Sequence, residues 1–445
     1  MFKTCMVFTA CSLGLCLNIS AKRYYVSANG KDNHNGSITA PFLSVQRAQK
    51  EVEPGDTVYI RGGIYRMTEE MIAGKSNNKA FVVLLNKDGL PGKRINYWAY
   101  PGEKPVFDFQ DVKPVNLRVH AFQVAGSYLH LKGLEVIGVQ VTLSGHTQSE
   151  CFENQGSHNI YEQLSMHDGQ AIGFYLTNGA NNLILNCDAY NNYDYTSENG
   201  KGGNTDGFGC HPGLTSAVNN IFRGCRAWFN SDDGYDCINA HTATTFEDCW
   251  AFYNGYSPSF KALADGNGFK AGGYGSTPPA KLPVDVPRNT VRFCLAVKNK
   301  NSGFYSNHHQ GGSDWYQNTA YLNAINYNMV NRKSRTEDGY LVDVPGYGHV
   351  LKNNLGFAGR NAEVKQMDES RCEQMSNSFN LPYTITADDF QSLDLAELTK
   401  ARKADGSLPD IQFMKLKSNS TLIGKGTAIG FPFQGKAPDL GYGVH

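Results

Sequence analysis

The segment NNLILNCDAYN at residues 181–191 recurs along the chain, each time with a cysteine, an alanine two positions later and then an asparagine. Weaker versions end at residues 320–323 and 355–358. The repeated cysteines are separated by 38, 24 and 45 residues. Such intervals are typical of repeats of a little over twenty residues that carry inserted loops. The cysteines of the four clear copies are Cys187, Cys225, Cys249 and Cys294.

Each copy alternates apolar and polar residues over a short run, which predicts a β-strand. No segment of helical periodicity and helix length separates the copies, so βαβ winding is disfavoured. The sequence therefore predicts an all-β parallel β-helix, in which each coil buries its apolar side chains against the next. We expect the four cysteines to form an inward ladder that packs the core, because small thiols are good core residues. Cys-x-x-Cys metal spacing is absent.

The composition agrees with a folded, turn-rich β protein. The chain has 445 residues, 40% of them hydrophobic, with 47 glycines, 24 tyrosines and 24 phenylalanines. Global disorder is excluded by this apolar content. The 41 basic and 41 acidic side chains give a net charge of zero, which argues against a nucleic-acid-binding protein.

The N-terminus predicts export. A basic start at Lys3 precedes an apolar stretch at residues 4–17 and small or polar residues to Ala21, which is typical of a signal peptide over residues 1–21. The stretch is too short to span a membrane. The segment before Cys16 resembles a lipoprotein cleavage site only loosely, so a lipid anchor is the minor alternative. Residues 22–445 contain no linker and are predicted to form one domain.

Both ends of the predicted β-helix need a cap that covers the core. Residues 41–53 have helical apolar spacing and a strand signal follows at residues 56–61, which predicts an N-terminal cap with a short helix. Near the other end, Thr386 and Asp389 resemble a capping box for a helix that continues to about Arg402. The remaining residues are expected to pack back on the coils.

Acidic residues cluster where two coils should lie side by side. Asp232, Asp233 and Asp236 lie within five residues, and Asp206 precedes Asp232 by 26 residues, about one coil. Four converging carboxylates repel one another unless a cation neutralises them. Ca²⁺ fits such a set, because it binds six to eight oxygen ligands, whereas Zn²⁺ usually brings His or Cys. The alternative is that these residues only form turns.

Lys270 lies in the glycine-rich segment GNGFKAGG at residues 266–273, about one coil plus a loop after Asp236. The glycines leave room for its amine to reach the surface. A lone lysine is usually a solvated charge, but beside a bound cation its pKa would fall and the neutral amine could act as a base.

At these residues the chain resembles polysaccharide lyase family 9, whose members are right-handed parallel β-helices of the pectin-lyase-like type that cleave pectic backbones. The resemblance spans nearly all of residues 22–445. It is carried by the segments YYVS (24–27), NNYD (191–194), DGFG (206–209), CRAW (225–228), NSDDGYD (230–236), GNGFKAGG (266–273) and APDLG (437–441).

The resemblance implies a site and a reaction. The family's calcium ligands fall on Asp206, Asp232, Asp233 and Asp236, and its Brønsted base falls on Lys270. The implied reaction is calcium-dependent β-elimination at a 4-linked galacturonate, which leaves a 4,5-unsaturated uronate.

One departure concerns the substrate, an acidic pectic polysaccharide. Where pectate-cleaving members carry a basic stretch, this chain has the sequence CHPGL at residues 210–214. Fewer cations suit a backbone with fewer consecutive carboxylates, so rhamnogalacturonan I is favoured slightly over homogalacturonan. Three histidines are possible substrate contacts: His211, His308 and His309.

Two alternatives stay open. Asp206, Asp232 and Asp233 also resemble the acidic motifs of inverting polygalacturonases, which use paired carboxylates as acid and base, but the Gly-His-Gly and Arg-x-Lys motifs of that family are absent. The aspartates could instead hold a structural calcium ion in a non-catalytic glycan-binding β-helix. In each case a capped β-helix needs no partner, which predicts a monomer.

Overall fold

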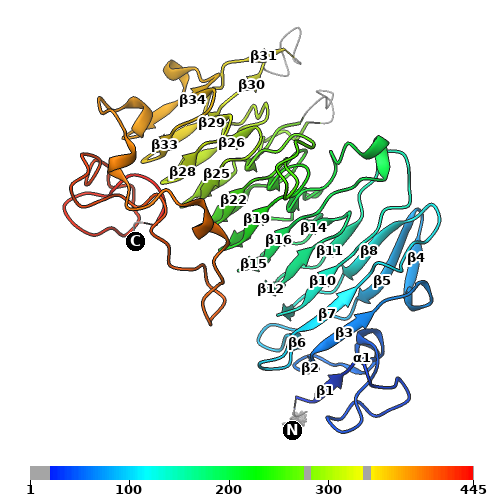
Figure 1. The fold of residues 1–445 in the computed structure, drawn as a ribbon. Helices are drawn as coiled ribbons and strands as arrows, with labels where there is room; N and C mark the ends of the chain where they lie inside the picture. Colours follow the sequence, from blue (N-terminus) through cyan, green and yellow to red (C-terminus); the bar gives the residue numbers. More distant parts are fainter. Residues whose placement is uncertain (1–20, 275–281, 334–341, 444–445) are drawn as a thin grey trace, which may run out of the picture.

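The computed structural model describes residues 21–274, 282–333 and 342–443, and it confirms the parallel β-helix. Three long sheets run along the molecule, and each complete coil contributes one parallel strand to each sheet (Figure 1). Sheet 1 contains β1 (Arg23–Val26), β2 (Thr57–Ile60), β6 (Ile95–Ala99), β9 (Leu129–Lys132), β12 (Ile160–Glu162), β15 (Leu183–Leu185), β18 (Asn220–Arg223), β21 (Thr244–Glu247), β24 (Thr290–Arg292), β27 (Asp314–Tyr316), β32 (Val350–Lys352) and β35 (Glu373–Met375).

Sheet 2 and sheet 3 complete each coil. Sheet 2 contains β3 (Gly63–Arg66), β7 (Pro105–Asp108), β10 (Glu135–Ile137), β13 (Ser165–His167), β16 (Asp188–Tyr190), β19 (Arg226–Trp228), β22 (Trp250–Phe252), β25 (Leu295–Val297), β28 (Thr319–Tyr321) and β33 (Leu355–Phe357). Sheet 3 contains β4 (Gly74–Ser76), β5 (Lys79–Leu85), β8 (Arg118–Val124), β11 (Glu150–Asn154), β14 (Ile172–Leu176), β17 (Phe208–Cys210), β20 (Tyr235–Asp236), β23 (Phe269–Lys270), β26 (Ser302–Tyr305), β29 (Ile325–Asn328) and β34 (Ala362–Lys365). A small antiparallel pair, β30 (Asn331–Arg332) and β31 (Asp343–Val344), lies beside it.

The corner between sheets 1 and 2 contains two residues in each coil from β9 to β33. The first residue is in the left-handed region, as at Asn186 (φ 54°) and Asp248 (φ 52°), and this reverses the chain tightly. The second residue is fully or almost fully buried, and it is the position of the predicted cysteine ladder, which is confirmed. All eight cysteines among the described residues are free thiols. The ladder positions are Leu134, Leu164, Cys187, Cys225, Cys249, Cys294, Asn318 and Asn354.

Aromatic rings stack inside sheet 3. The rings of Phe208, Tyr235, Phe269, Phe304 and Tyr327 follow one another at centroid distances of 5.0, 4.6, 5.2 and 5.0 Å. Each such pair adds about 0.5–1.5 kcal/mol beyond the area it buries. The stack therefore fixes the inner face of the sheet, and the alternating residues must point outward.

A ladder of buried asparagines forms the corner between sheets 2 and 3. The side-chain amide of each donates to the side-chain oxygen of the next, over steps of 38, 24, 45 and 24 residues. These steps are the coil lengths, so an uninterrupted coil has 24 residues here and the longer ones carry loops. The ladder contains Asn192, Asn230, Asn254, Asn299 and Asn323.

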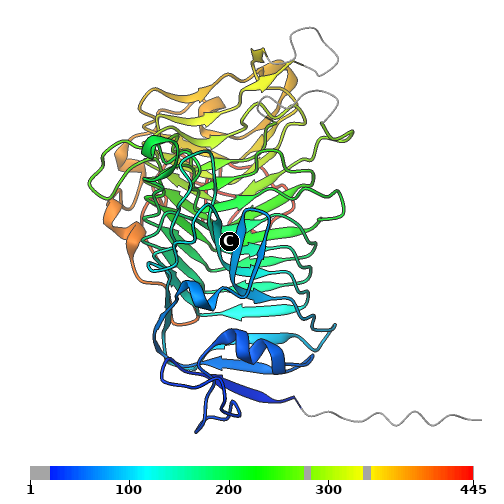
Figure 2. The ribbon, with the colours of Figure 1, turned by 90° about the vertical axis from the view of Figure 1, so that its right-hand side faces the viewer.

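The N-terminal cap is confirmed. Helix α1 (Val45–Glu51) begins after Ser44, whose hydroxyl accepts a hydrogen bond from the Arg47 N–H, and it lies at the first coils of the β-helix (Figure 2). A short 3-10 helix (Glu69–Met71) follows, and another (Ser197–Gly200) lies in a loop before sheet 3. Residues 1–20 of the predicted signal peptide lie outside the described part, and the division into a leader and one domain stays a prediction. None of the described helices has the length and apolar character that a membrane span requires.

The continuous helix predicted from Thr386 to Arg402 is wrong. The capping box between Thr386 and Asp389 forms, but the helix it starts ends at once (Ala387–Asp389), and a second one spans Leu395–Thr399. Between them Phe390 is extended and buried, with its ring 5.1 Å from that of Phe357 on sheet 2. Packing against the sheet thus overrides the local helical signal. Two further 3-10 helices span Glu369–Arg371 and Ser378–Asn380.

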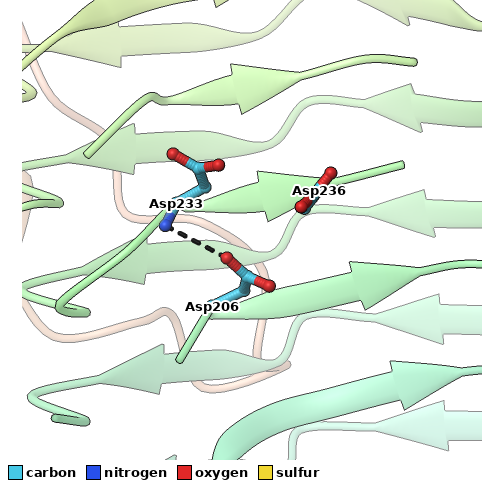
Figure 3. A group of neighbouring side chains, drawn as sticks. All are labelled: Asp206, Asp233 and Asp236. Carbon is cyan, nitrogen blue, oxygen red and sulfur yellow. Dashed lines mark hydrogen bonds between the residues drawn. The ribbon is translucent and has the colours of Figure 1, made fainter. Parts of the chain in front are cut away.

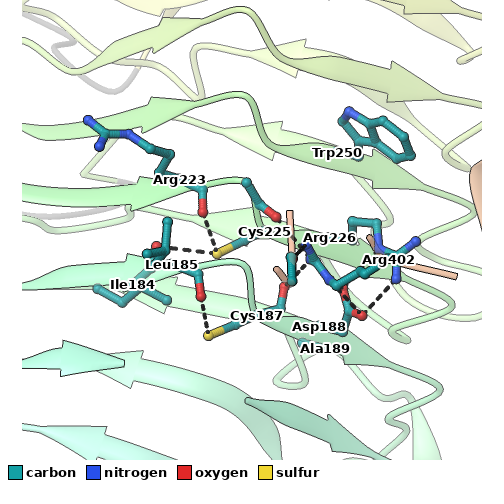
Figure 4. Close-up of polar contacts among 12 residues, drawn as sticks. Ile184, Leu185, Cys187, Asp188, Ala189, Arg223, Cys225, Arg226, Trp250 and Arg402 are labelled. Atoms are coloured by element: carbon teal, nitrogen blue, oxygen red, sulfur yellow. Dashed lines mark hydrogen bonds and ion pairs between the residues drawn. The ribbon is translucent and has the colours of Figure 1, made fainter. Parts of the chain in front are cut away.

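An ion network fastens this C-terminal tail to the coils (Figure 4). The carboxylate of Asp188 lies 2.8 Å from the guanidinium of Arg226 and 2.7 Å from that of Arg402. Burial alone would raise the pKa of Asp188, but the two guanidinium groups hold it below its usual value. The tail therefore packs on the outer face of sheet 2.

Candidate metal and lysine site

Strand register places the predicted site residues on adjacent coils of sheet 3. Gly209 pairs with Asp236, and Asp236 pairs with Lys270. Because Phe208 pairs with Tyr235, Asp206 is level with Asp233 and not with Asp232. The backbone N–H of Asp233 donates to Oδ1 of Asp206 at 3.1 Å, as Figure 3 shows.

Three of the four predicted carboxylates converge. One oxygen from each of Asp206, Asp233 and Asp236 lies within 4.8 Å of the others, and all three residues are buried. Within the described ranges this is the one group of acidic, histidine or cysteine residues with that geometry. Asp232 lies beside the group, and its Oδ1 accepts a hydrogen bond from the Asp265 N–H at 3.1 Å.

Lys270 lies against the same carboxylates. Its Nζ is 3.0 Å from Oδ2 of Asp236 and 3.1 Å from Oδ2 of Asp233. Burial disfavours the ammonium, but Asp233 and Asp236, followed by Asp232 and Asp206, outweigh it and raise the pKa of Lys270 well above its ordinary value. The lysine and a cation would thus bind to the same oxygens.

The donor set fits a hard cation. Burial raises the pKa values of Asp206, Asp232 and Asp233, and repulsion from the neighbouring aspartates raises them further. Oδ2 of Asp233 is buried and makes no aligned hydrogen bond, although the Lys270 amine lies near it. Carboxylate oxygens without nitrogen or sulfur ligands are the set that Ca²⁺ binds.

Glycines allow the coils to approach one another at this site. A Cβ atom on Gly207 would lie 2.8 Å from the carbonyl oxygen of Gly234, and one on Gly234 would lie 2.7 Å from that of Gly268. Glycine is therefore required directly after Asp206 and Asp233, because a side chain there would separate the coils.

Asn267 is a site residue that the sequence reasoning missed. Its backbone N–H and side-chain amide both donate to Oδ1 of Asp233, at 2.7 and 2.8 Å. A signal for it exists, since DGFG at residues 206–209, DGYD at 233–236 and NGFK at 267–270 repeat one polar–Gly–aromatic pattern. Aligning these segments predicts the observed register.

The three histidines have different surroundings. His211 adjoins the site, with Nδ1 3.0 Å from the Tyr175 hydroxyl and Nε2 3.8 Å from Asp236. His308 lies 3.2 Å from Asp343. His309 is buried away from the surface, where burial lowers its pKa to about 4.

Comparisons with known proteins agree with this geometry. Residues 24–354 match the family described as "Pel9A-like, right handed beta helix region". The chain is 34% identical to pectate lyase L of Dickeya chrysanthemi, over 98% of this chain and 94% of that protein. It is 28% identical to pectate lyase PEL9 of Emericella nidulans, over 89% and 92% of the two chains.

Two solved structures superpose on nearly the whole chain. A rhamnogalacturonan lyase shares 44% identity with a TM-score of 0.85, covering 89% of this chain and 97% of its own. The pectate lyase Pel9A shares 31% identity with a TM-score of 0.76, covering 95% and 96%. The right-handed winding expected from the resemblance is thereby confirmed.

Proposed function

Because the chain belongs to polysaccharide lyase family 9 and is a polysaccharide lyase, we propose that it cleaves a pectic backbone by calcium-dependent β-elimination at a 4-linked galacturonate. The observation that carries the proposal is the contact of Lys270 with the buried carboxylates of Asp233 and Asp236. Rhamnogalacturonan I is the preferred polymer and homogalacturonan the second.

Asp206, Asp233 and Asp236 would hold the calcium ion, with Asp232 as a further ligand beside them. When bound, the cation stabilises negative charge that develops on the uronate carboxylate and so acidifies the adjacent C5–H. The buried position of these aspartates keeps their orientation fixed, and Asn267 holds Asp233 by two hydrogen bonds.

Lys270 is the base. Once the charges of all four aspartates are neutralised, burial remains as the main effect on the amine and favours its neutral form. Nζ then takes the proton from C5, the C–H electron pair forms the C4–C5 double bond, and the C4–O bond breaks. The departing oxygen takes a proton from water.

The substrate preference rests on two observations. The rhamnogalacturonan lyase shares 44% identity with this chain, whereas pectate lyase L and Pel9A share 34% and 31%. The segment at residues 210–214 also contains no lysine or arginine. The hydrolase and non-catalytic alternatives are disfavoured, because the relatives and structures above are lyases.

An ultraviolet assay for unsaturated products tests the proposal. We expect product from rhamnogalacturonan I with calcium, and none with a chelator or with Lys270→Ala. Lys31→Ala, which removes an exposed lysine near the N-terminus, should retain full activity. Saturated products, or a Lys270→Ala protein as active as the wild type, would contradict the proposed reaction.

We also propose that residues 1–21 direct export and that residues 22–445 act as a monomer. Mass spectrometry of the protein recovered outside the cell should give the mass of a chain that begins at residue 22. Light scattering should give the mass of one such chain. A retained leader or a dimer mass would contradict the respective statement.

A further inference from the structure

The outward side chains of sheet 3 form a single row in strand register. Tyr175 pairs with Gly209, Gly209 with Asp236, Asp236 with Lys270, and Lys270 with Tyr305. Their chain neighbours form the inner aromatic stack, so these residues face outward. Successive members are about 4.8 Å apart, the interstrand spacing. We call Tyr175, Gly209, Asp236, Lys270, Tyr305 and Asn328 the outer row.

Aromatic rings flank the Asp236–Lys270 pair on both sides. The Tyr175 ring lies across Gly209, where a Cβ atom would be 2.4 Å from its Cδ2. His211 holds this ring through the 3.0 Å contact between Nδ1 and the tyrosine hydroxyl. On the other side Tyr305 follows Lys270 directly, and burial raises its pKa to about 12, so its hydroxyl is neutral.

Among the six residues of the outer row, charge is confined to Asp236 and Lys270. The next residue beyond Tyr175 is Glu153, whose carboxylate is paired with His120 at 2.7 Å. Beside the row, Arg332 and His308 both lie 3.2 Å from the carboxylate of Asp343, which balances the charge of Arg332, and burial lowers the pKa of His308. The face of an aromatic ring carries partial negative charge, so it attracts the C–H groups of a sugar and repels a carboxylate. The positions next to the reacting uronate therefore suit neutral sugars.

We propose that Tyr175 and Tyr305 are specificity-determining residues that bind the neutral sugars on either side of the reacting uronate. A substrate with a carboxylate on every sugar places charge over both rings, whereas one in which uronate alternates with a neutral deoxyhexose places apolar faces there. This inference rests on the proposed function and narrows it to polymers of the alternating class.

Four variants test the inference: Tyr305→Leu, Tyr305→Phe, Tyr175→Leu and Tyr175→Phe. Leucine keeps an apolar side chain and removes the ring, and phenylalanine keeps the ring. We expect each leucine variant to lower kcat/KM on rhamnogalacturonan I oligosaccharides about tenfold, which is about 1.4 kcal/mol. The change should lie mainly in KM, and the phenylalanine variants should stay within about threefold of wild type.

Tyr59→Leu is the matched control, because Tyr59 is a half-buried outward tyrosine on sheet 1 that stacks on Tyr25. It should leave kcat/KM unchanged on rhamnogalacturonan I and on homogalacturonan.

A binding experiment separates recognition from catalysis. Calorimetry measures the binding of the same oligosaccharides and of oligogalacturonates to the Lys270→Ala protein, with and without Tyr305→Leu. We expect the leucine change to weaken binding of the alternating ligand about tenfold and that of oligogalacturonate much less.

Two results would overturn the inference while leaving the lyase proposal intact. One is an equal loss on both polymers in the leucine variants, and the other is no loss on either. Failure of the proposed function itself would look different, since wild type would then release no unsaturated product from any pectic polymer.

Discussion

At the scale of single residues, Asp233 contacts three other members of the site. Its N–H donates to Asp206, its Oδ1 accepts from Asn267, and its Oδ2 lies near the amine of Lys270. Asp232, next to it in sequence, points its Oδ1 to the backbone of Asp265 instead. The two neighbours should therefore differ in their effect on the cation.

We predict that Asp233→Asn lowers calcium affinity by more than about tenfold and abolishes detectable lyase activity. The amide can still accept from Asn267, so the fold should survive. Asp232→Asn should weaken calcium binding less, because Asp232 lies outside the converging trio. Calorimetry with calcium alone measures this, and an equal loss in both variants would make Asp232 a direct ligand of equal weight.

The residues of the site were largely predictable, whereas their pairing was not. The cluster of aspartates and the lysine followed from spacing and from the family resemblance. Spacing counted from Asp206 pointed to Asp232, and the strand pairing that selects Asp233 depends on Phe208 stacking against Tyr235. Tyr175 carried no local signal, because its role depends on the absence of a side chain at Gly209.

At the scale of elements, the glycines beside the site, Gly207 and Gly234, allow neighbouring coils to lie at their close spacing. We predict that Gly234→Ala destabilises the protein by about 1–3 kcal/mol, since the added Cβ would lie 2.7 Å from a backbone oxygen. Gly213→Ala is the matched control, because nothing lies within 4 Å of its Cβ. Urea unfolding measures both, and equal stability of the two variants would show that the coils separate freely.

Elements with strong local patterns were predicted correctly, and those shaped by distant contacts were not. The repeat and helix α1 each follow from nearby residues, as with Ser44 at the start of the helix. The segment after Asp389 has the local pattern of a helix, but Phe390 is buried against Phe357 and is paired in sheet fashion with Leu416. Contacts between residues so far apart in the sequence do not affect the local periodicity, so the sequence pattern could not predict them.

At the scale of the whole molecule, buried histidines with raised and with lowered pKa values limit the pH range in which the fold is most stable. His120 lies between Glu150 and Glu153, at 3.0 and 2.7 Å, paired by charge and not by aligned hydrogen bonds. Burial opposes its charge, but the two carboxylates raise its pKa to about 9. His309 and His349 are held neutral by burial, with pKa values of about 4 and about 3.

The signs of these shifts predict that the three histidines together contribute most to stability near pH 6.5. The contribution of His120 is complete below about pH 6.5 and is lost as the pH rises through about 9. The contribution of His309 and His349 is present above about pH 6.5 and is lost as the pH falls toward about 4 and about 3. Thermal unfolding between these limits measures the profile.

His120→Gln separates the two effects. It should flatten the profile on the alkaline side. On the acidic side the losses from His309 and His349 should persist, and Glu153 should take up a proton at higher pH, because His120 helps to hold the pKa of Glu153 at about 2. A variant that loses stability equally at every pH would show that His120 stabilises by shape and not by charge.

The two-residue corner between sheets 1 and 2 has the same length in every coil from β9 to β33, whereas the connections on both sides of sheet 3 vary. Genetic insertions are therefore tolerated where loops border the reactive face and rejected at the invariant corner. Natural variation or directed evolution can change the surroundings of Lys270 by lengthening those loops. The stacked coils that support the loops keep the same structure.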